Sequence, residues 1–200
     1  MIHLGLTGSI GMGKTTTAKM FADMGVPSFN ADKAVHELYA KNGEAVIAIQ
    51  QKIPGVVINQ TVDREALTRH LADNPDDFMV LEQLVHPLVA KAREQWLQEQ
   101  KRTGSSVVLF DIPLLFENQM EKSLDFVVLA TAPKNVQRSR VLIRKNMNEQ
   151  KFEQILNRQM PDEEKRKKAH YIVETGNGME NARLQVKAIL RHIKQNNFKS

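Results

Sequence analysis

Short apolar runs alternate along this chain with longer segments in which apolar residues recur at helical spacing. The short runs predict five strands, at residues 2–7, 26–29, 106–110, 125–131 and 171–174. Helical patterns occupy residues 14–24, 32–40, 133–144 and 179–193. Strands that alternate with helices in this way favour an α/β fold with a mainly parallel sheet.

One longer segment interrupts the alternation between the second and third strands. Residues 42–102 are almost wholly helical in pattern, and a stripe of apolar side chains lies at helical spacing in Leu81, Leu84, Val85, Leu88, Val89, Ala92 and Trp96. Such a stripe predicts packing against a neighbouring helix. From its position, we expect residues 33–102 to form an inserted helical subdomain that covers a substrate.

A second segment stands out by its charge. The chain has 28 Lys and Arg against 23 Asp and Glu, and residues 134–168 alone contain 11 basic and 5 acidic residues. Their helical pattern is broken near Asn146 and Pro161. Such a segment either binds an anionic partner (nucleic acid, anionic lipid or a phosphate-bearing ligand) or is a solvated helical face. Phe152 is its only aromatic residue, which argues against stacking on nucleic-acid bases.

The composition excludes several classes of protein. With 42% apolar and 26% charged residues the chain is expected to fold, and without cysteine it has no disulfide, thiolate metal site or cysteine nucleophile. No apolar run approaches the roughly 18 residues that span a bilayer, and no signal-peptide pattern opens the chain. We therefore expect a single cytoplasmic domain over residues 1–200, with no membrane partner.

The strongest chemical signal is a glycine-rich segment between the first predicted strand and the first predicted helix. It reads Gly8-Ser9-Ile10-Gly11-Met12-Gly13-Lys14-Thr15 and fits G-x-x-x-x-G-K-[ST]. Glycines allow main-chain N–H groups to converge on an anion, and the helix adds the positive end of its dipole. Lys14 is expected to reach the β- and γ-phosphates of a nucleoside triphosphate and Thr15 to hold Mg²⁺, with Thr16 in the same site.

Two other loop types were considered for this segment. A dinucleotide-binding loop that begins at Gly11 requires a third glycine at position 16, where this chain has Thr16. The remaining alternative is a glycine-rich turn without any ligand. Because the segment matches G-x-x-x-x-G-K-[ST] between a predicted strand and a predicted helix, we predict a loop that binds ATP or GTP with Mg²⁺.

Two acidic residues follow predicted strands, at the edge of the sheet where ligands of such folds bind. Three roles are open for Asp32: a general base for an attacking hydroxyl, a metal ligand, or an acid in the first turn of a helix that Asn30 caps. Asp111 closes the third strand, where an acid can orient Mg²⁺ through water. The loop at 112–117 is too apolar for an ordinary surface turn and is expected to cover a ligand or a subdomain. Its Glu117 either supports the site or is a surface acid.

The basic segment supplies further candidates. Arg140 and Arg144 share one helix face, whereas Arg138 points elsewhere. A helical flap that carries these two arginines would close over a triphosphate and neutralise its charge. The run at 165–168 is predicted to be a solvated helix end, and His86 is predicted to be a packed or capping residue.

In combination, these motifs resemble the dephospho-CoA kinase family. The resemblance covers residues 2–178 and rests on the segments from Leu4 to Thr15, Asn30 to Asp32, His86 to Val89, Asp111 to Glu117 and Arg140 to Arg144, followed by Gln154-Ile155 and Gln159. It implies a P-loop nucleotide-kinase-like three-layer fold with an inserted helical acceptor domain and a helical lid. It also implies transfer of the ATP γ-phosphoryl group to the ribose 3′-hydroxyl of dephospho-CoA, the last step of coenzyme A synthesis.

The resemblance also implies a role for each matching residue. Lys14, Asp32 and Arg140 are the implied catalytic residues, and Arg140 and Arg144 of the lid at 134–168 join the glycine-rich loop in binding ATP. Mg²⁺ is implied at Thr15, Asp32 and Asp111. The implied acceptor site comprises Asp32, His86, Pro113, Leu114, Leu115, Phe116 and Glu117. ATP and dephospho-CoA are the implied partners, and a monomer or weak homo-oligomer is expected.

The chain departs from the family pattern at two places. Asn30 stands where the family usually has Asp, and Thr175-Gly176 stands where the family has Asn before Gly. Two other functions remain open on the sequence: a kinase for a different small molecule or a nucleoside monophosphate, and a nucleic-acid-binding ATPase that uses the basic segment.

Overall fold

The computed structural model describes residues 1–197, which form two compact units. The first unit consists of Met1–Phe29 and the chain from Thr103 onward, and the second is Asn30–Arg102. Within residues 1–197, no helix is both long enough and apolar enough to cross a membrane.

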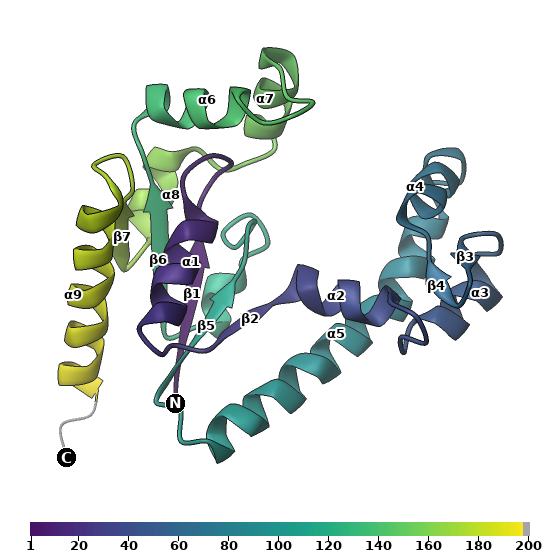
Figure 1. Ribbon diagram of the computed structural model, residues 1–200, viewed down its shortest axis with the longest axis horizontal. Coiled ribbons are helices and arrows are strands. Elements are labelled where there is room, and N and C mark those ends of the chain that lie inside the picture. Colours follow the sequence, from purple (N-terminus) through teal and green to yellow (C-terminus); the bar gives the residue numbers. More distant parts are fainter. Residues whose placement is uncertain (198–200) are drawn as a thin grey trace. The chain divides into compact units, whose positions relative to one another are not determined.

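A five-stranded sheet lies at the centre of the first unit (Figure 1). Its strands, in spatial order, are β2 (Ser28–Asn30), β5 (Val107–Asp111), β1 (Ile2–Thr7), β6 (Phe126–Thr131) and β7 (Tyr171–Glu174). The β1–β5, β1–β6 and β6–β7 pairs are parallel, with Leu6 opposite both Asp111 and Val128. The predicted α/β fold with a mainly parallel five-stranded sheet is confirmed. Parallel pairing brings the carboxyl ends of these strands to one edge, where the phosphate loop follows β1.

Helices α1 (Lys14–Asp23) and α9 (Met179–Asn197) cover one face of this sheet. Leu4 and Leu6 of β1 are buried with Phe21 of α1 and Val186 of α9 in one apolar cluster. Gly5 lies between those two leucines in the strand and therefore faces the other side. A Cβ on Gly5 would lie 2.5 Å from the Leu124 side chain and 2.8 Å from the Leu115 side chain, so both leucines pack closely on the sheet at this glycine.

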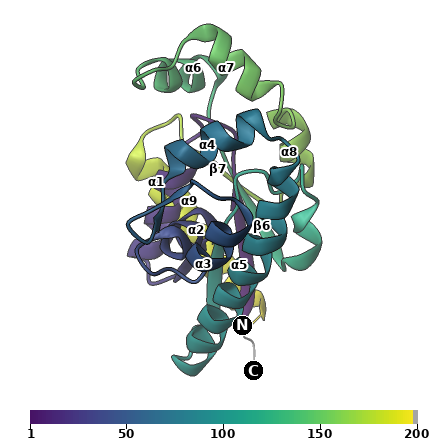
Figure 2. The same cartoon turned by 90° about the vertical axis from the view of Figure 1, so that its right-hand side faces the viewer.

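Three short helices form the segment at 134–168, which we call the lid segment. They are α6 (Lys134–Leu142), α7 (Glu149–Leu156) and α8 (Asp162–Lys168), and α6 and α7 lie beyond the carboxyl end of β6 (Figures 1 and 2). Asn146 has a positive φ of 63° between the first two helices, and Pro161 begins α8. The predicted breaks at these two residues are confirmed. A 3₁₀ helix, Met120–Ser123, precedes β6.

The second unit is mainly helical around an apolar core of its own. It contains α2 (Ala31–Tyr39), α3 (Val46–Lys52), β3 (Val57–Ile58), β4 (Thr61–Val62), α4 (Arg64–Asp73) and α5 (Asp77–Arg102). Leu81 and Val85 from the predicted apolar stripe are buried in this core, beside Leu38 and Ile49. Leu84, Leu88 and Val89 pack against the same core, so the stripe from Leu81 to Val89 packs against neighbouring helices, as its spacing predicted.

Two details of the predicted elements were wrong. The pattern at 42–102 gave no indication of the β3–β4 hairpin, whose turn residues Asn59 and Gln60 have φ of 49° and 61°. Positive φ at both central positions matches the twist of a two-residue hairpin. The second strand begins at Ser28 and not at Val26, because the Val26 N–H donates back to the Phe21 carbonyl and closes α1.

Candidate functional site: a phosphate loop under a lid

The phosphate loop, Gly8–Thr15, joins β1 to α1, and its glycines are required by its shape. Gly11 and Gly13 have φ of 76° and 88°, a region that side chains disfavour. Gly13 also lies against Thr175, since a Cβ added there would be 2.8 Å from the Thr175 hydroxyl. Among the described residues 1–197, no side chain caps α1 at Gly13, so the first-turn N–H groups of this helix remain available to an anion.

A cavity of about 620 Å³ opens above this loop in the first unit. It is lined by eight residues of Gly8–Thr16, namely Gly8, Ser9, Ile10, Gly11, Gly13, Lys14, Thr15 and Thr16. Arg140 and Arg144 of the lid segment and Pro113 also line it, together with Thr175. The structure thus brings most of the predicted ATP-binding residues to one cavity.

Met12 is the member of the loop that does not line this cavity. Its side chain is buried, and its Sδ accepts a hydrogen bond from the Ala132 N–H at 3.1 Å. Its own N–H donates to the Ser9 carbonyl. Met12 therefore holds the loop on β6 and offers the cavity neither its side chain nor its N–H.

The predicted phosphate-binding lysine is paired with the predicted metal-orienting acid. The Lys14 ammonium donates to the Asp111 carboxylate, and both side chains are largely buried. The strand register explains this meeting, because Asp111 ends β5 opposite Leu6, at the edge of the sheet where β1 runs into the loop. A polyphosphate and a cation that enter this cavity can each replace one partner of the pair.

Two glutamines of the lid segment form hydrogen bonds with the tip of the phosphate loop. Gln137 of α6 donates through Nε2 to the Ile10 carbonyl at 2.8 Å, and the Gln159 Oε1 accepts from the Ile10 N–H at 3.1 Å. Gln137 and Gln159 were not among the predicted site residues. Gln159 appeared in the family resemblance, and that was its only signal in the sequence.

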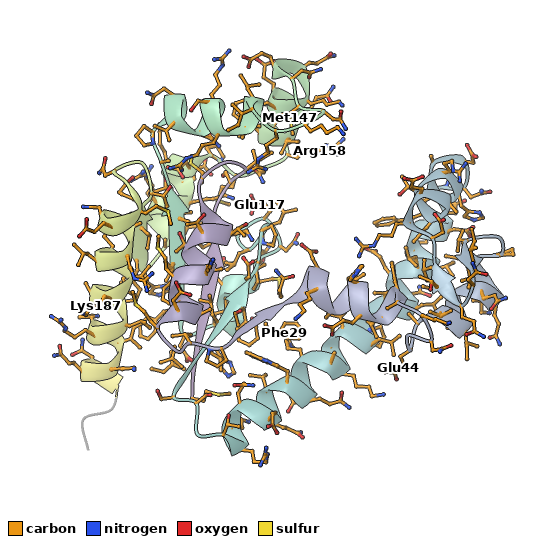
Figure 3. All side chains as sticks on the ribbon, in the orientation of Figure 1. Phe29, Glu44, Glu117, Met147, Arg158 and Lys187 are labelled. Carbon is orange, nitrogen blue, oxygen red and sulfur yellow. The ribbon has the colours of Figure 1, made fainter. Side chains whose placement is uncertain are left out.

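Arg140 is anchored in the same region and Arg144 is exposed. The Arg140 guanidinium donates to the Thr175 hydroxyl and to the Thr175 carbonyl, both at 2.8 Å. Arg138 pairs with Glu149 on the surface, away from this cavity. Met147 and Arg158 flank α7 in this lid segment, two positions before it begins and two after it ends (Figure 3).

The 112–117 loop has buried and exposed members. Leu115 and Phe116 are buried in an apolar cluster with Val127, which corrects the expectation that their side chains contact an acceptor. Pro113 lines the cavity and Leu114 is exposed, so these two can still contact a ligand. The loop is apolar mainly because it packs on the sheet.

Glu117 ends this loop and binds the lid segment (Figure 3). Its Oε1 lies 2.9 Å from Lys165 Nζ and accepts a hydrogen bond from the Met160 N–H at 2.8 Å. Burial opposes ionisation, but the Lys165 ammonium and the N–H groups of Glu117 and Met160 together keep the pKa of the carboxyl below its ordinary value. Glu117 thus holds two segments together.

Lys165 corrects a further expectation. The run at 165–168 was predicted to be solvated, yet the Lys165 side chain is 0% exposed. Three acidic residues in the first turn of α8 and four basic residues in its last turn fit the helix dipole. The first of those basic residues points inward to Glu117.

The remaining candidates belong to the second unit. Asp32 is exposed in the first turn of α2, and Asn30 caps that helix by accepting a hydrogen bond from the Lys33 N–H at 2.9 Å. The cap explains how Asn is accommodated where the family usually has Asp. His86 is exposed on α5 and lies 3.9 Å from Glu82, so the expectation that it is packed was wrong.

The residues around the phosphate loop fit Mg²⁺. Within residues 1–197, no three His, Asp or Glu side chains converge on a point that would hold a metal alone. Mg²⁺ is usually held by one or two carboxylates, substrate phosphates and water. The Asp111 carboxylate beside Lys14 and the exposed Thr15 at the start of α1 supply oxygen ligands of this kind.

The comparisons by sequence give one family. The dephospho-CoA kinase family model matches residues 2–181. A dephospho-CoA kinase from Agrobacterium fabrum is 50% identical over 193 residues, which cover 96% of this chain and 98% of that protein. The crystal structure of TT1252 from Thermus thermophilus matches with a TM-score of 0.78 and 30% identity, covering 96% of this chain and 97% of that one. A dephospho-CoA kinase from Campylobacter jejuni shares the fold, with a TM-score of 0.72, 24% identity and 98% of each chain covered.

Proposed function

This chain belongs to the dephospho-CoA kinase family, and from that premise we propose that it transfers the γ-phosphoryl group of ATP to the ribose 3′-hydroxyl of dephospho-CoA. The observation that carries the proposal is a cavity of about 620 Å³ that is lined by both the phosphate loop and the two lid arginines. It combines a site for a polyphosphate with cations that can neutralise charge developing during its transfer.

In the proposed mechanism, the phosphate loop and Lys14 bind the β- and γ-phosphates. Their arrival would draw Lys14 away from Asp111, and the Asp111 carboxylate and the Thr15 hydroxyl are the groups that would hold Mg²⁺. Bound Mg²⁺ supplies a further positive charge to the phosphate oxygens. The Lys14–Asp111 pair thus keeps both charges compensated until the ligands replace it.

The two lid arginines supply the remaining positive charge. Arg140 and Arg144 line the same cavity as the loop, and the lid segment already contacts the loop at Ile10. In a loose phosphoryl-transfer transition state, charge spreads over the γ-phosphoryl oxygens, and fixed cations stabilise that charge without reorganisation. We assign the 134–168 segment to this role of lid.

We propose acceptor-binding roles for the exposed residues that the family resemblance implies. Asp32, in the first turn of α2, is the proposed base that accepts the proton of the 3′-hydroxyl. His86, Pro113 and Leu114 are exposed and suited to contact the acceptor. Leu115, Phe116 and Glu117 act only by shaping the loop.

The basic lid segment gives little support to the nucleic-acid alternative. Arg140 binds Thr175, Lys165 binds Glu117, and Arg166 binds both Asp162 and Glu174. Glu117 and Glu174 lie outside the segment, so two of its six excess positive charges are compensated inside the protein. We propose ATP and dephospho-CoA as partners, in the cytoplasm, with a monomer or weak homo-oligomer as the working form.

A coupled assay of ADP release tests the proposal. The purified chain is assayed with Mg²⁺-ATP and, in turn, dephospho-CoA, AMP, GMP and shikimate, and mass spectrometry identifies the product. Of the four acceptors, we expect only dephospho-CoA to be turned over. The mass of its product should exceed that of dephospho-CoA by one phosphoryl group. Preferential phosphorylation of another acceptor would contradict it. Nucleic-acid affinity that falls steeply with salt would support the ATPase alternative.

A further inference from the structure

Thr175 lies where three parts of the first unit meet. It directly follows β7, and its N–H donates to the Thr131 carbonyl of β6 at 2.8 Å. Its side-chain hydroxyl donates to the Met12 carbonyl of the phosphate loop at 2.9 Å. Although Thr175 lines the nucleotide cavity, it is only 8% exposed. Its hydroxyl is therefore fixed by the protein before any ligand arrives.

The same hydroxyl also binds the lid. Arg140 donates through Nη1 to the Thr175 hydroxyl and through Nη2 to the Thr175 carbonyl, both at 2.8 Å, with a longer contact of 3.5 Å from Nη1 to the Gly11 carbonyl. A hydroxyl can donate one hydrogen bond and still accept others. Thr175 uses both capacities, so it connects Met12 of the loop to Arg140 of α6.

This bidentate contact determines which edge of the guanidinium is left for a ligand. The planar guanidinium has five N–H donors in a fixed arrangement, and Thr175 takes one from each terminal nitrogen. Among residues 1–197, the Arg140 Nε–H has no hydrogen-bond acceptor. Because Arg140 lines the cavity, the fork held by Thr175 fixes how its remaining donors are presented there.

We propose that Thr175 is a positioning residue for phosphoryl transfer, whose hydroxyl ties Arg140 to the phosphate loop and orients its guanidinium toward the polyphosphate. This inference rests on the proposed function of Arg140. Orientation in advance matters because a cation already in place stabilises developing charge without reorganising during the reaction. A freely rotating arginine would lose side-chain entropy at the same step.

Substitution of Thr175 by Val tests the proposal, since Val keeps the branched shape and removes the hydroxyl. We expect Thr175→Val to lower kcat about tenfold, as for the loss of one hydrogen bond to a charged group. The KM for dephospho-CoA should change by less than about twofold, and Thr175→Ser should restore most of kcat. Thr131→Val is the matched control. It removes a buried hydroxyl that binds Asp162 and Arg166, and we expect a lower melting temperature with normal kcat.

A double-mutant cycle separates positioning from a merely structural role. If Thr175 acts through Arg140, adding Thr175→Val to Arg140→Ala should lower kcat by less than about twofold further. Independent, multiplicative losses would overturn the proposal, as would a Thr175→Val protein with kcat within twofold of the wild type. If the Thr175→Val protein melts below the assay temperature, the double-mutant cycle with Arg140→Ala is measured with Thr175→Ala instead, and the same outcomes support or overturn the proposal.

The proposed function and this inference can fail separately. A wild-type protein that phosphorylates a different acceptor would contradict the dephospho-CoA assignment, but the cycle can still be measured by ADP release with that acceptor. Coupling between positions 175 and 140 would then still support the positioning role. Absence of coupling in an enzyme that does phosphorylate dephospho-CoA would refute the positioning role alone.

Discussion

The buried pair between Lys165 and Glu117 gives a prediction with a clear sign and size. Lys165 is 0% exposed and Glu117 is 15% exposed, so Lys165→Met leaves a mostly buried carboxylate without its cation. Removing one partner of a buried pair destabilises a protein by about 3–5 kcal/mol. Glu117 keeps the hydrogen bond from the Met160 N–H, so we expect the lower end, about 3 kcal/mol at pH 7.

The sign of the pH dependence follows from the direction of the pKa shift. In the wild type, the pKa of Glu117 lies below its ordinary value of 4.5, so its contribution is present above that value and is lost as pH falls through the folded-state pKa. In Lys165→Met, burial without the ammonium should raise the pKa of Glu117 instead. The stability deficit of the variant should therefore shrink as the pH is lowered from 7 to 5.

Thermal and urea unfolding of both proteins at pH 7 and pH 5 measure this effect. For a chain of this size, about 3 kcal/mol corresponds to a fall in melting temperature of about 6–12 °C. The matched control is Lys167→Met, which removes the same charge from an exposed position of the same helix. If Lys165→Met and Lys167→Met unfold alike, or if the deficit does not depend on pH, the buried pair does not stabilise the lid segment as argued.

Three further predictions concern the site. Asp32→Ala should lower kcat by at least about 100-fold with an unchanged melting temperature, and near-normal turnover would exclude its role as base. Gly13→Ala places a Cβ 2.8 Å from the Thr175 hydroxyl at a φ of 88°, whereas Gly25→Ala pairs a similar φ of 80° with nothing within 4 Å. Calorimetric titration should find ATP affinity lost only in Gly13→Ala, and equal affinities would contradict the steric argument. Arg140→Ala should reduce kcat/KM for ATP more than for the acceptor in steady-state assays; the reverse would place Arg140 at the acceptor.

Local sequence patterns predicted the elements that frame the site. The strand at 2–7, the glycine-rich loop and the helix from Lys14 follow from signals within about twenty consecutive residues. The β3–β4 hairpin was not predicted because each of its strands has only two residues, too few to show an alternation of apolar and polar positions. Lys165 was misassigned because a run of four basic residues carries no local sign that one of them is buried.

The order of residues along the chain was enough to determine the parallel sheet, the phosphate loop and the family, since periodicity and loop chemistry depend on near neighbours. It did not determine which distant groups meet. Ile10 and Gln159 are 149 positions apart, Lys14 and Asp111 are 97 apart, and Arg140 and Thr175 are 35 apart. Such pairs form only when the packing of strands and helices brings their atoms together and removes water. For this reason the tertiary structure decides where the charges of the site are compensated and how its arginine is held.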